Sequence, residues 1–375
     1  MKIHLLSAGM KSPNGRATLF PIIRYHSALK KAGYPIRWFR SPSPACLAGQ
    51  VLCVELKYLT HLRRFSQAEA IAFLDKLSQK VPSLWLFDNS DSTALALPQI
   101  LPKVDLYIKN QLLLDRRKYL RHFEGSTLFT DFYANTHPGE FSSELEGSWK
   151  RGSVDDPQWL GKLAVAWNSG LSDYSPDGPS RLRRAKKATR FLPRALHAAF
   201  FQPPRALGRP SVDRPLSLHC RMNFSYQPDI FSAQRKKVAR TLGLAEQATQ
   251  KLPRKEYFQE LLNTWAVLSP FGYGEITLKD FEAFLCGNVL VKPDMSHMET
   301  WPPLYEAWKT YVPVKWDLSD LSERLEDIEE NREHYLPIAI EGQSRYIEFL
   351  SGPHAGELFA HQVKKVAESA ENTRN

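Results

Sequence analysis

The sequence contains few cysteines and no long apolar run. Four cysteines occur in 375 residues, and their spacing matches neither a zinc site nor a disulfide framework: Cys46, Cys53, Cys220 and Cys286. We therefore expect buried free thiols in a reducing compartment. No apolar run approaches the roughly 20 residues that a membrane-spanning helix needs. These absences argue against a zinc protein, a disulfide-rich secreted domain and a membrane-spanning protein.

Internal repeats and recognised DNA- or RNA-binding motifs are also absent from the sequence. What is present is a composition with 43% hydrophobic and 11% aromatic residues, enough to bury sizeable cores. A chain of 375 residues exceeds one ordinary domain, so we expect two domains of roughly 150 to 200 residues each.

The first half alternates short apolar runs with helical patterns. Strands are expected at residues 3–8, 36–39, 51–56, 84–87 and 104–108, with helices after the first and third of them. Such alternation predicts a parallel sheet covered by helices on both faces. From about residue 129 to 179 the pattern weakens, and we expect long loops that carry binding residues.

A basic stretch follows at residues 181–214, where ten Lys and Arg accompany one acidic residue, Asp213. Between residues 181 and 200 the cations are interleaved with apolar residues, as in a helix that lies on an anionic membrane. Pro193 would interrupt that helix. A solvated interdomain linker is the open alternative, and nucleic acid is the partner that we expect least.

The second half contains a strand, a glycine loop, a capped helix and a second strand in succession. Trp265 begins an apolar run, and Gly272 and Gly274 then mark a sharp turn. Thr277 and Asp280 have the spacing of a capping box, and the helix they open should end at Gly287. A glycine loop before a helix presents free amides and a positive dipole end, so the segment predicts an anion site.

This segment resembles the donor-binding segment of GT-B glycosyltransferases, in particular CgeB-like enzymes and glycosyltransferase families 1 and 4. The resemblance covers about 50 residues, chiefly 269–275, 280–293 and 311–321. It implies two Rossmann-like, doubly wound domains that face a cleft. It also implies that Gly272, Tyr273 and Gly274 form the donor site, with the two glycine amides on the diphosphate.

The same resemblance assigns further donor contacts. Glu282 would hold the nucleotide ribose, and Arg221 together with Lys236 or its neighbour Lys237 would neutralise the departing diphosphate. Glu275 would act at the transferred sugar. Retaining members carry seven residues between their two glutamates, whereas six separate Glu275 from Glu282, so the stereochemical outcome stays open.

An inverting transferase also needs a general base from the first domain. The candidates lie at predicted strand ends or in the long loops: Asp88, Asp91, Asp131, His137, Glu140 and Asp173. We favour Asp88, Asp131 and Asp173 as the catalytic residues among them. Basic residues and a helix dipole replace a divalent ion in this fold family, so we expect no metal and no cofactor besides the nucleotide-sugar substrate.

The sequence therefore predicts a metal-independent GT-B glycosyltransferase that passes a sugar to a glycan or glycolipid, in bacterial cell-surface polysaccharide synthesis. Residues 1–205 would form the acceptor domain, 212–350 the donor domain, and 351–375 a helix that returns to the first domain. We expect a cytoplasmic protein, with a peripheral position on the inner face of the membrane as the alternative. The alternatives are a nucleotide-sugar epimerase and a non-catalytic basic protein that binds nucleic acid or membrane.

Overall fold

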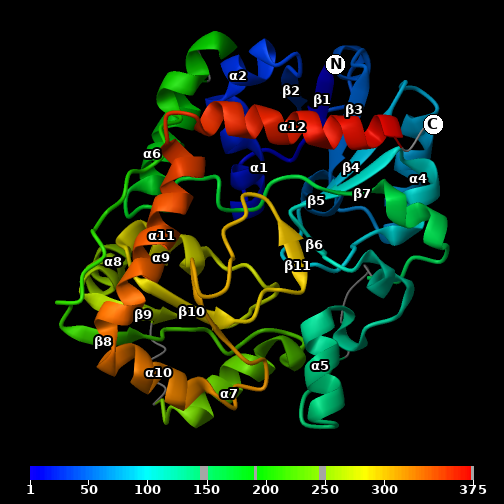
Figure 1. Cartoon of the computed structure of the whole chain (residues 1–375). Helices are drawn as coiled ribbons and strands as arrows, with labels where there is room; N and C mark the ends of the chain where they lie inside the picture. The colour runs from blue at the N-terminus through cyan, green and yellow to red at the C-terminus, as the bar shows by residue number, and fades with distance from the viewer. Residues whose placement is uncertain (144–150, 190–191, 245–250, 373–375) are drawn as a thin grey trace.

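The computed structural model describes residues 1–143, 151–189, 192–244 and 251–372, and contains two parallel β-sheets (Figure 1). The first sheet has six strands in the order β2 (Ile36–Phe39), β1 (Ile3–Leu6), β3 (Val51–Glu55), β4 (Leu84–Asp88), β5 (Leu106–Lys109), β7 (Leu163–Val165). The second has four, in the order β12 (Val312–Val314), β10 (Val289–Pro293), β9 (Thr264–Leu268), β8 (Leu216–His219). The predicted α/β class, with two Rossmann-like domains, is confirmed.

Helices cover both sheets. The first part of the chain contributes α1 (Pro13–Arg24), α2 (His26–Lys31), α3 (Pro44–Leu47), α4 (Gln67–Ser78), α5 (Leu128–Thr136) and α6 (Gly178–Ala188). The second contributes α7 (Ala233–Thr241), α8 (Arg254–Leu262), α9 (Leu278–Cys286), α10 (Leu321–Glu330), α11 (Arg332–Ser351) and α12 (Ala355–Asn372).

Helix α5 is a departure from the loop expected after residue 129. It begins with a capping box in which Thr127 and Thr130 each bond the other's backbone amide. The sequence pattern missed it because Phe129 and Tyr133 do not pack on the first sheet. They enter the core of the second domain instead, where Phe129 contacts the rings of Phe231 and Phe271.

The strand order of the first sheet creates a place for a ligand. The chain winds outward from β1 to β2 on one side and from β3 to β7 on the other, so the direction reverses between β1 and β3. In such sheets, ligands bind outside the carboxyl ends of the strands at the reversal. The loops that follow β1 and β4 lie at this edge, and both reach the candidate site described below.

The C-terminal helices tie the two domains together. Helix α11 packs on α9 and β10 of the second domain, and α12 then crosses back over α2, β5 and β7 of the first (Figure 1). Phe359 of α12 is fully buried in the first core, and Gln362 donates to the carbonyl of Val165 at 2.8 Å. Burial of this apolar face stabilises the contact between the domains.

A second link is a short antiparallel ribbon between β6 (Gln111–Leu113) of the first domain and β11 (Met298–Thr300) of the second. The amide of Leu114 extends the ribbon by donating to the carbonyl of His297 at 2.8 Å. Each strand has only three residues, too few to produce a clear periodic pattern, so the sequence did not predict the ribbon.

All four cysteines are free and buried, as the sequence predicted. Burial raises the pKa of Cys46 and of Cys220 to about 11 in each case, which keeps both thiols protonated near neutral pH. Within the described ranges, no helix combines the length and the apolar character that crossing a bilayer requires.

Replacement of Gly274 by alanine should separate the two domains locally. A Cβ at this position would lie 1.7 Å from the carbonyl oxygen of Asp91, an overlap that only backbone movement can relieve. We expect the free energy of unfolding to fall by at least about 1 to 3 kcal/mol. Thermal denaturation measures this, with Gly161→Ala as the control because no atom lies within 4 Å of its added Cβ. Equal losses in both variants would contradict the close contact.

Candidate active site

A cavity of about 210 Å³ lies between the two domains. Its walls come from the start of α1, the loops after β4 and β7, the glycine loop after β9 with the start of α9, and the segment around α7. The lining residues are Pro13, Asn14, Asp91, Ser169, Tyr226, Arg235, Gly272, Tyr273, Gly274, Ile276, Thr277 and Leu278. The cavity therefore combines two carboxyl-terminal sheet edges, as expected for a ligand site in α/β domains.

The glycine loop and α9 have the local structure that the sequence predicted. Thr277 and Asp280 form the expected capping box, and Gly287 ends the helix with a left-handed φ of 73°. Asp280 also pairs with the buried ammonium of Lys292 at 3.1 Å, which fixes the helix start to β10. The amide of Gly272 donates to the carbonyl of Gly274 at 3.0 Å, so this amide closes the turn.

Arg235 of α7 is the cation that lies against the glycine loop. Its Nε donates to the carbonyl of Phe271 at 2.6 Å, and its guanidinium lies 4.7 Å from the centre of the Tyr226 ring. A Cβ on Gly272 would come within 3.0 Å of its Nη2, so the glycine leaves room for this side chain. Burial lowers the pKa of Arg235, but a guanidinium stays charged near neutral pH.

The basic pair predicted from the sequence is placed elsewhere. Lys236 pairs with Asp229 at 2.5 Å, and Arg221 pairs with Glu260 at 2.8 Å. Neither residue lines the cavity. Arg235 faces the glycine loop and its neighbour Lys236 does not, because consecutive side chains on a helix point about 100° apart.

Two tyrosines form the aromatic part of the cavity wall. The rings of Tyr226 and Tyr273 lie 4.5 Å apart between centroids, tilted by 56°. Tyr273 is 41% exposed although it belongs to a loop between buried elements. The exposed ring of Tyr273 packs on Tyr226, which itself lies against the Arg235 guanidinium, and offers a flat apolar face to a ligand.

Glu282 is not among the residues that line the cavity. Its carboxylate accepts from the hydroxyl of Tyr257 at 2.8 Å and lies 3.4 Å from Nη1 of Arg254. Burial raises the pKa of Glu282, against the opposing charge of Arg254. Arg254 also donates to the carbonyl of Tyr174 at 2.5 Å, so this cluster joins α8 and α9 to the first domain.

Glu275 is buried in the contact between the domains. Its two oxygens accept from the amide and the hydroxyl of Thr93, at 3.0 and 2.6 Å. Burial alone would raise the pKa of Glu275, but the His297 ring, 3.7 Å away, and the Thr93 hydroxyl lower it overall. Its position fits a link between the glycine loop and the β4 loop better than contact with a transferred sugar.

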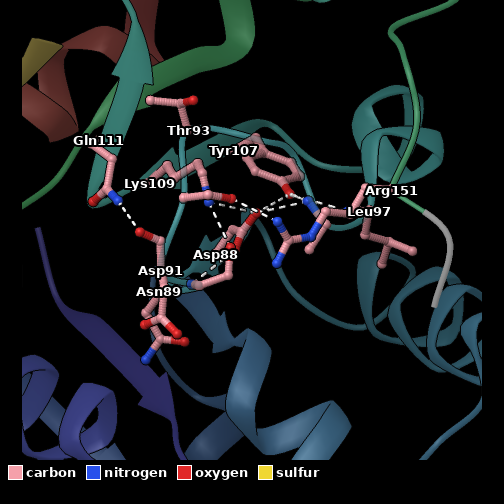
Figure 2. Close-up of polar contacts among 12 residues, drawn as sticks. Asp88, Asn89, Asp91, Thr93, Leu97, Tyr107, Lys109, Gln111 and Arg151 are labelled. Carbon is pink, nitrogen blue, oxygen red and sulfur yellow. Dashed lines mark hydrogen bonds and ion pairs between the residues drawn. The ribbon is translucent and has the colours of Figure 1, made fainter. Parts of the chain in front are cut away.

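Asp88 ends β4 inside the first domain, where its carboxylate is fully buried (Figure 2). It accepts from the hydroxyl of Tyr107 at 2.6 Å and from the amide of Ala96 at 2.9 Å, and it lies 3.2 Å from Nζ of Lys109. Burial raises its pKa, but the charge of Lys109 and the Tyr107 hydrogen bond outweigh this and lower the pKa to about 2. Asp88 thus anchors a loop and does not face the cavity.

Asp91, three residues further on, does face the cavity. Its Oδ1 accepts from Nδ2 of Asn14 at 2.7 Å, and its carbonyl accepts from Gln111 at 2.5 Å (Figure 2). Lys109 holds the same loop through the hydroxyl of Ser90, at 2.7 Å. Of the carboxylates considered from the sequence, Asp91 is the one on the cavity wall.

Asp131 and Asp173, the other two carboxylates that the sequence favoured as the general base, do not line the cavity. Asp131 of α5 pairs with Arg121 at 3.0 Å, and Asp173 is buried against Arg181 at 2.8 Å. His137 and Glu140 contact α7, through Lys237 at 3.2 Å and Arg240 at 2.6 Å. Tertiary packing therefore gives all four of these residues protein partners.

The basic stretch forms two short pieces. Helix α6 ends at Ala188, and a 3-10 turn, η6 (Arg194–Phe200), follows. Arg190 lies outside the described residues. Leu182 and Ala185 of α6 pack into the first core, whereas Phe200 of η6 is 43% exposed. The helical stretch is thus interrupted near Pro193, as the sequence predicted.

Asn14, Tyr226 and Arg235 are among the residues of the cavity wall that the sequence did not predict. Asn14 lies two residues after the N-cap of α1, the helix that follows the loop after the first strand. Because ligands bind at this end of a parallel sheet, the position could have identified Asn14 as a site residue. Arg235 is one of three consecutive cations in the sequence, with Lys236 and Lys237. The sequence does not show which of the three faces the cavity. Tyr226 offers no local signal.

Two facing parallel sheets with a cavity at their carboxyl ends define a two-domain α/β protein with a candidate ligand site between its domains. No known protein-family profile matches the chain. Human (Homo sapiens) protein O-glucosyltransferase 3 is 36% identical over 97 residues, which are 25% of this chain and 19% of that protein. The chain thus matches about a fifth of the length of this relative.

Similar solved structures cover nearly the whole chain at low identity. Sucrose-phosphate synthase from Thermosynechococcus elongatus is 11% identical with a TM-score of 0.44, over 99% of this chain and 100% of that one. HepE from Anabaena in complex with UDP is 12% identical with a TM-score of 0.42, over 98% and 100%. An α-glucosyltransferase in complex with UDP-glucose and DNA is 10% identical with a TM-score of 0.42, over 98% and 99%. Likeness at this level carries no argument about activity.

The buried pair of Asp88 and Lys109 should make stability fall in acid. The folded pKa of Asp88, about 2, lies below its ordinary value, so the pair stabilises the protein above about pH 4 and loses this effect as the pH falls towards 2. The contribution is about 2 to 3 kcal/mol. Asp88→Asn should cost about 3 to 5 kcal/mol at neutral pH, because it leaves Lys109 buried without a counter-charge.

Urea denaturation at pH 7 and between pH 4 and 2 measures both effects. The double variant Asp88→Asn, Lys109→Met is the control, since it removes both charges and should regain part of the stability lost. An Asp88→Asn variant with unchanged stability at pH 7 would show that the pair contributes nothing.

Proposed function

We propose that this protein is a glycosyltransferase that moves a sugar from a nucleotide-sugar donor to a glycan or glycolipid acceptor. The observation that carries the proposal is the cavity between the sheets, where the glycine loop, Arg235 and two tyrosines meet the carboxylate of Asp91. The partial match to protein O-glucosyltransferase 3 supports the same class of reaction, within the 97 residues that align.

The donor fits the wall formed by the second domain. Arg235 beside the glycine loop supplies a fixed positive charge, and the start of α9 adds the positive end of a helix dipole. The negatively charged diphosphate is the part of a nucleotide sugar that the cation and the helix dipole would bind. The exposed ring of Tyr273 next to Tyr226 offers an apolar face for the base or the sugar ring.

Departure of the nucleotide leaves negative charge on phosphate oxygens, and a fixed cation stabilises this charge as it develops. Arg235 is held by the carbonyls of Phe271 and Asn223, at 2.6 and 3.1 Å, so its guanidinium does not have to be reorganised during the reaction. Its remaining N–H groups are available to an anion, because a guanidinium carries five donors.

Asp91 fits the role of a general base better than the other carboxylates. A base must reach the acceptor hydroxyl, and Asp91 is exposed on the cavity wall next to the glycine loop. Asn14 holds one of its oxygens at 2.7 Å, which leaves the other oxygen to accept a proton. In this assignment Asp88 and Lys109 act only by placing the loop.

The finer parts of the proposal concern acceptor and location. The exposed cations of α6 and the exposed Phe200 suit a protein that reaches a membrane-linked acceptor, as in the synthesis of bacterial surface polysaccharides. The four buried free thiols suit a cytoplasmic location, where nucleotide sugars would serve as donors.

Binding of UDP, GDP, CMP, TDP and ADP should be compared by the shift that each causes in the melting temperature. A nucleotide that binds only the native state raises its stability, and a concentration of 100 times Kd adds about 2.7 kcal/mol. We expect one nucleotide to produce a clear shift, strongly reduced in Arg235→Gln. Lys236→Gln is the matched control, since its ammonium contacts Asp229 outside the cavity.

A full shift in Arg235→Gln together with a lost shift in Lys236→Gln would restore the pair predicted from the sequence. No shift with any nucleotide would count against a nucleotide-sugar donor and favour a non-catalytic role.

Asp91→Asn should lower kcat by about 100-fold or more, with the nucleotide-induced shift retained. Sugar transfer to an acceptor, or hydrolysis of the donor when none is present, provides the rate. Asp131→Asn is the control because Asp131 lies outside the cavity wall. An Asp91→Asn enzyme with the wild-type rate would exclude this residue as the base.

A further inference from the structure

Three cations of the first domain lie within electrostatic reach of a fourth, Lys186, near the start of α1 that lines the cavity. Lys11 and Arg16 flank the cavity residues Pro13 and Asn14, in the loop after β1 and the first turns of α1. Arg40 directly follows β2, whose end is tied to β1 by the bond from the amide of Ser7 to the carbonyl of Phe39, at 2.9 Å. These three residues thus share the carboxyl edge of the first sheet.

The fourth cation is Lys186 of α6. The neighbouring Ala185 is buried in the first core, which holds α6 against this edge of the domain. Burial lowers the pKa of Lys186, and the positive charges of Arg40, Arg16 and Lys11 lower it further. Each of these three cations acts electrostatically on the ammonium of Lys186, so the four charges form one group. We call Lys11, Arg16, Arg40 and Lys186 the rim cluster.

The rim cluster lacks compensating charge. In the part of the chain that the structure describes, no ion pair involves Lys11, Arg16, Arg40 or Lys186. Other surface cations of this region do have partners, as Arg181 has Asp173 at 2.8 Å. Like charges that repel one another without a counter-ion cost stability, and a protein tolerates such a group most readily where an anion binds.

From this arrangement we infer that the acceptor is anionic, a sugar that carries a phosphate group, and that the rim cluster binds this group while Asp91 faces the acceptor hydroxyl. The inference rests on the proposed function, since it names the substrate class of the same cavity. The donor diphosphate has its own cation, Arg235, which lies against the glycine loop of the second domain. The positive charge of the rim cluster is therefore not needed for the donor and is free to bind the acceptor.

The same chemistry could be presented by a phosphorylated sugar or by the phosphate of a lipid headgroup. Mannose 6-phosphate and neutral mannose serve as the soluble probes, and vesicles of phosphatidylglycerol and of phosphatidylcholine as the lipid probes. Binding is measured by titration calorimetry and by vesicle sedimentation, with the full chain saturated by the nucleotide that raises its melting temperature. Saturation keeps the phosphate probe out of the donor site.

The test variant is Arg16→Gln, Arg40→Gln, and the matched control is Arg183→Gln, Arg184→Gln. The control removes two exposed charges from α6 that do not act on Lys186. We expect the wild type to bind mannose 6-phosphate but not mannose, with affinity that falls as salt rises. The test variant should bind at least 10-fold more weakly, and the control within about twofold of the wild type.

Phosphatidylglycerol vesicles that bind the wild type and the control but not the test variant would support the anion site and assign the phosphate to a lipid headgroup. Equal losses in test and control variants would overturn the inference, as would equal binding of mannose and mannose 6-phosphate. A test variant that loses the nucleotide-induced shift would also overturn it, by assigning the cluster to the donor.

If no nucleotide shifts the melting temperature, the probes are titrated into the nucleotide-free protein. Binding of mannose 6-phosphate there, lost in the test variant, would keep the anion site while the donor proposal fails. The two proposals therefore fail separately.

Discussion

The close backbone contact between Gly274 and Asp91 is the constraint on which the site depends. A methyl group at position 274 would lie 1.7 Å from the carbonyl oxygen of Asp91, so the two loops touch only because this residue has no side chain. The next residue, Glu275, is fully buried and accepts two hydrogen bonds from Thr93. The glycine loop of one domain and the β4 loop of the other thus form one continuous wall.

Each domain anchors its side of this wall with a buried lysine and aspartate. Asp88 and Lys109 lie 3.2 Å apart at the end of β4, and Asp280 and Lys292 lie 3.1 Å apart where α9 meets β10, with all four side chains fully buried. Compared with a well-packed apolar pair, a buried ion pair gains little stability, because desolvation offsets most of its attraction. Their value here is positional, since each pair fixes a loop that faces the cavity.

Charge is divided across the cavity in a way that suits two substrates. The second domain presents Arg235 beside the glycine loop, and the first presents Asp91, with the rim cluster beyond it. A negative side chain between two positive regions separates the places where two anions would bind. The deeper carboxylates, Glu275 and Glu282, serve the contact between the domains instead, through Thr93 and Arg254.

The sequence by itself determined the α/β class, the positions of most strands along the chain, and the capped helix from Thr277 to Gly287, because propensity, periodicity and capping act over a few neighbouring residues. It also predicted a ligand site at the glycine loop, and this loop lines the cavity between the domains. Only the tertiary structure decided which side chains line the cavity. Asp91 faces it and Asp88 does not, and Arg235 reaches the loop while Lys236 turns to Asp229. Local patterns do not fix side-chain direction, because that depends on packing between segments far apart in the chain.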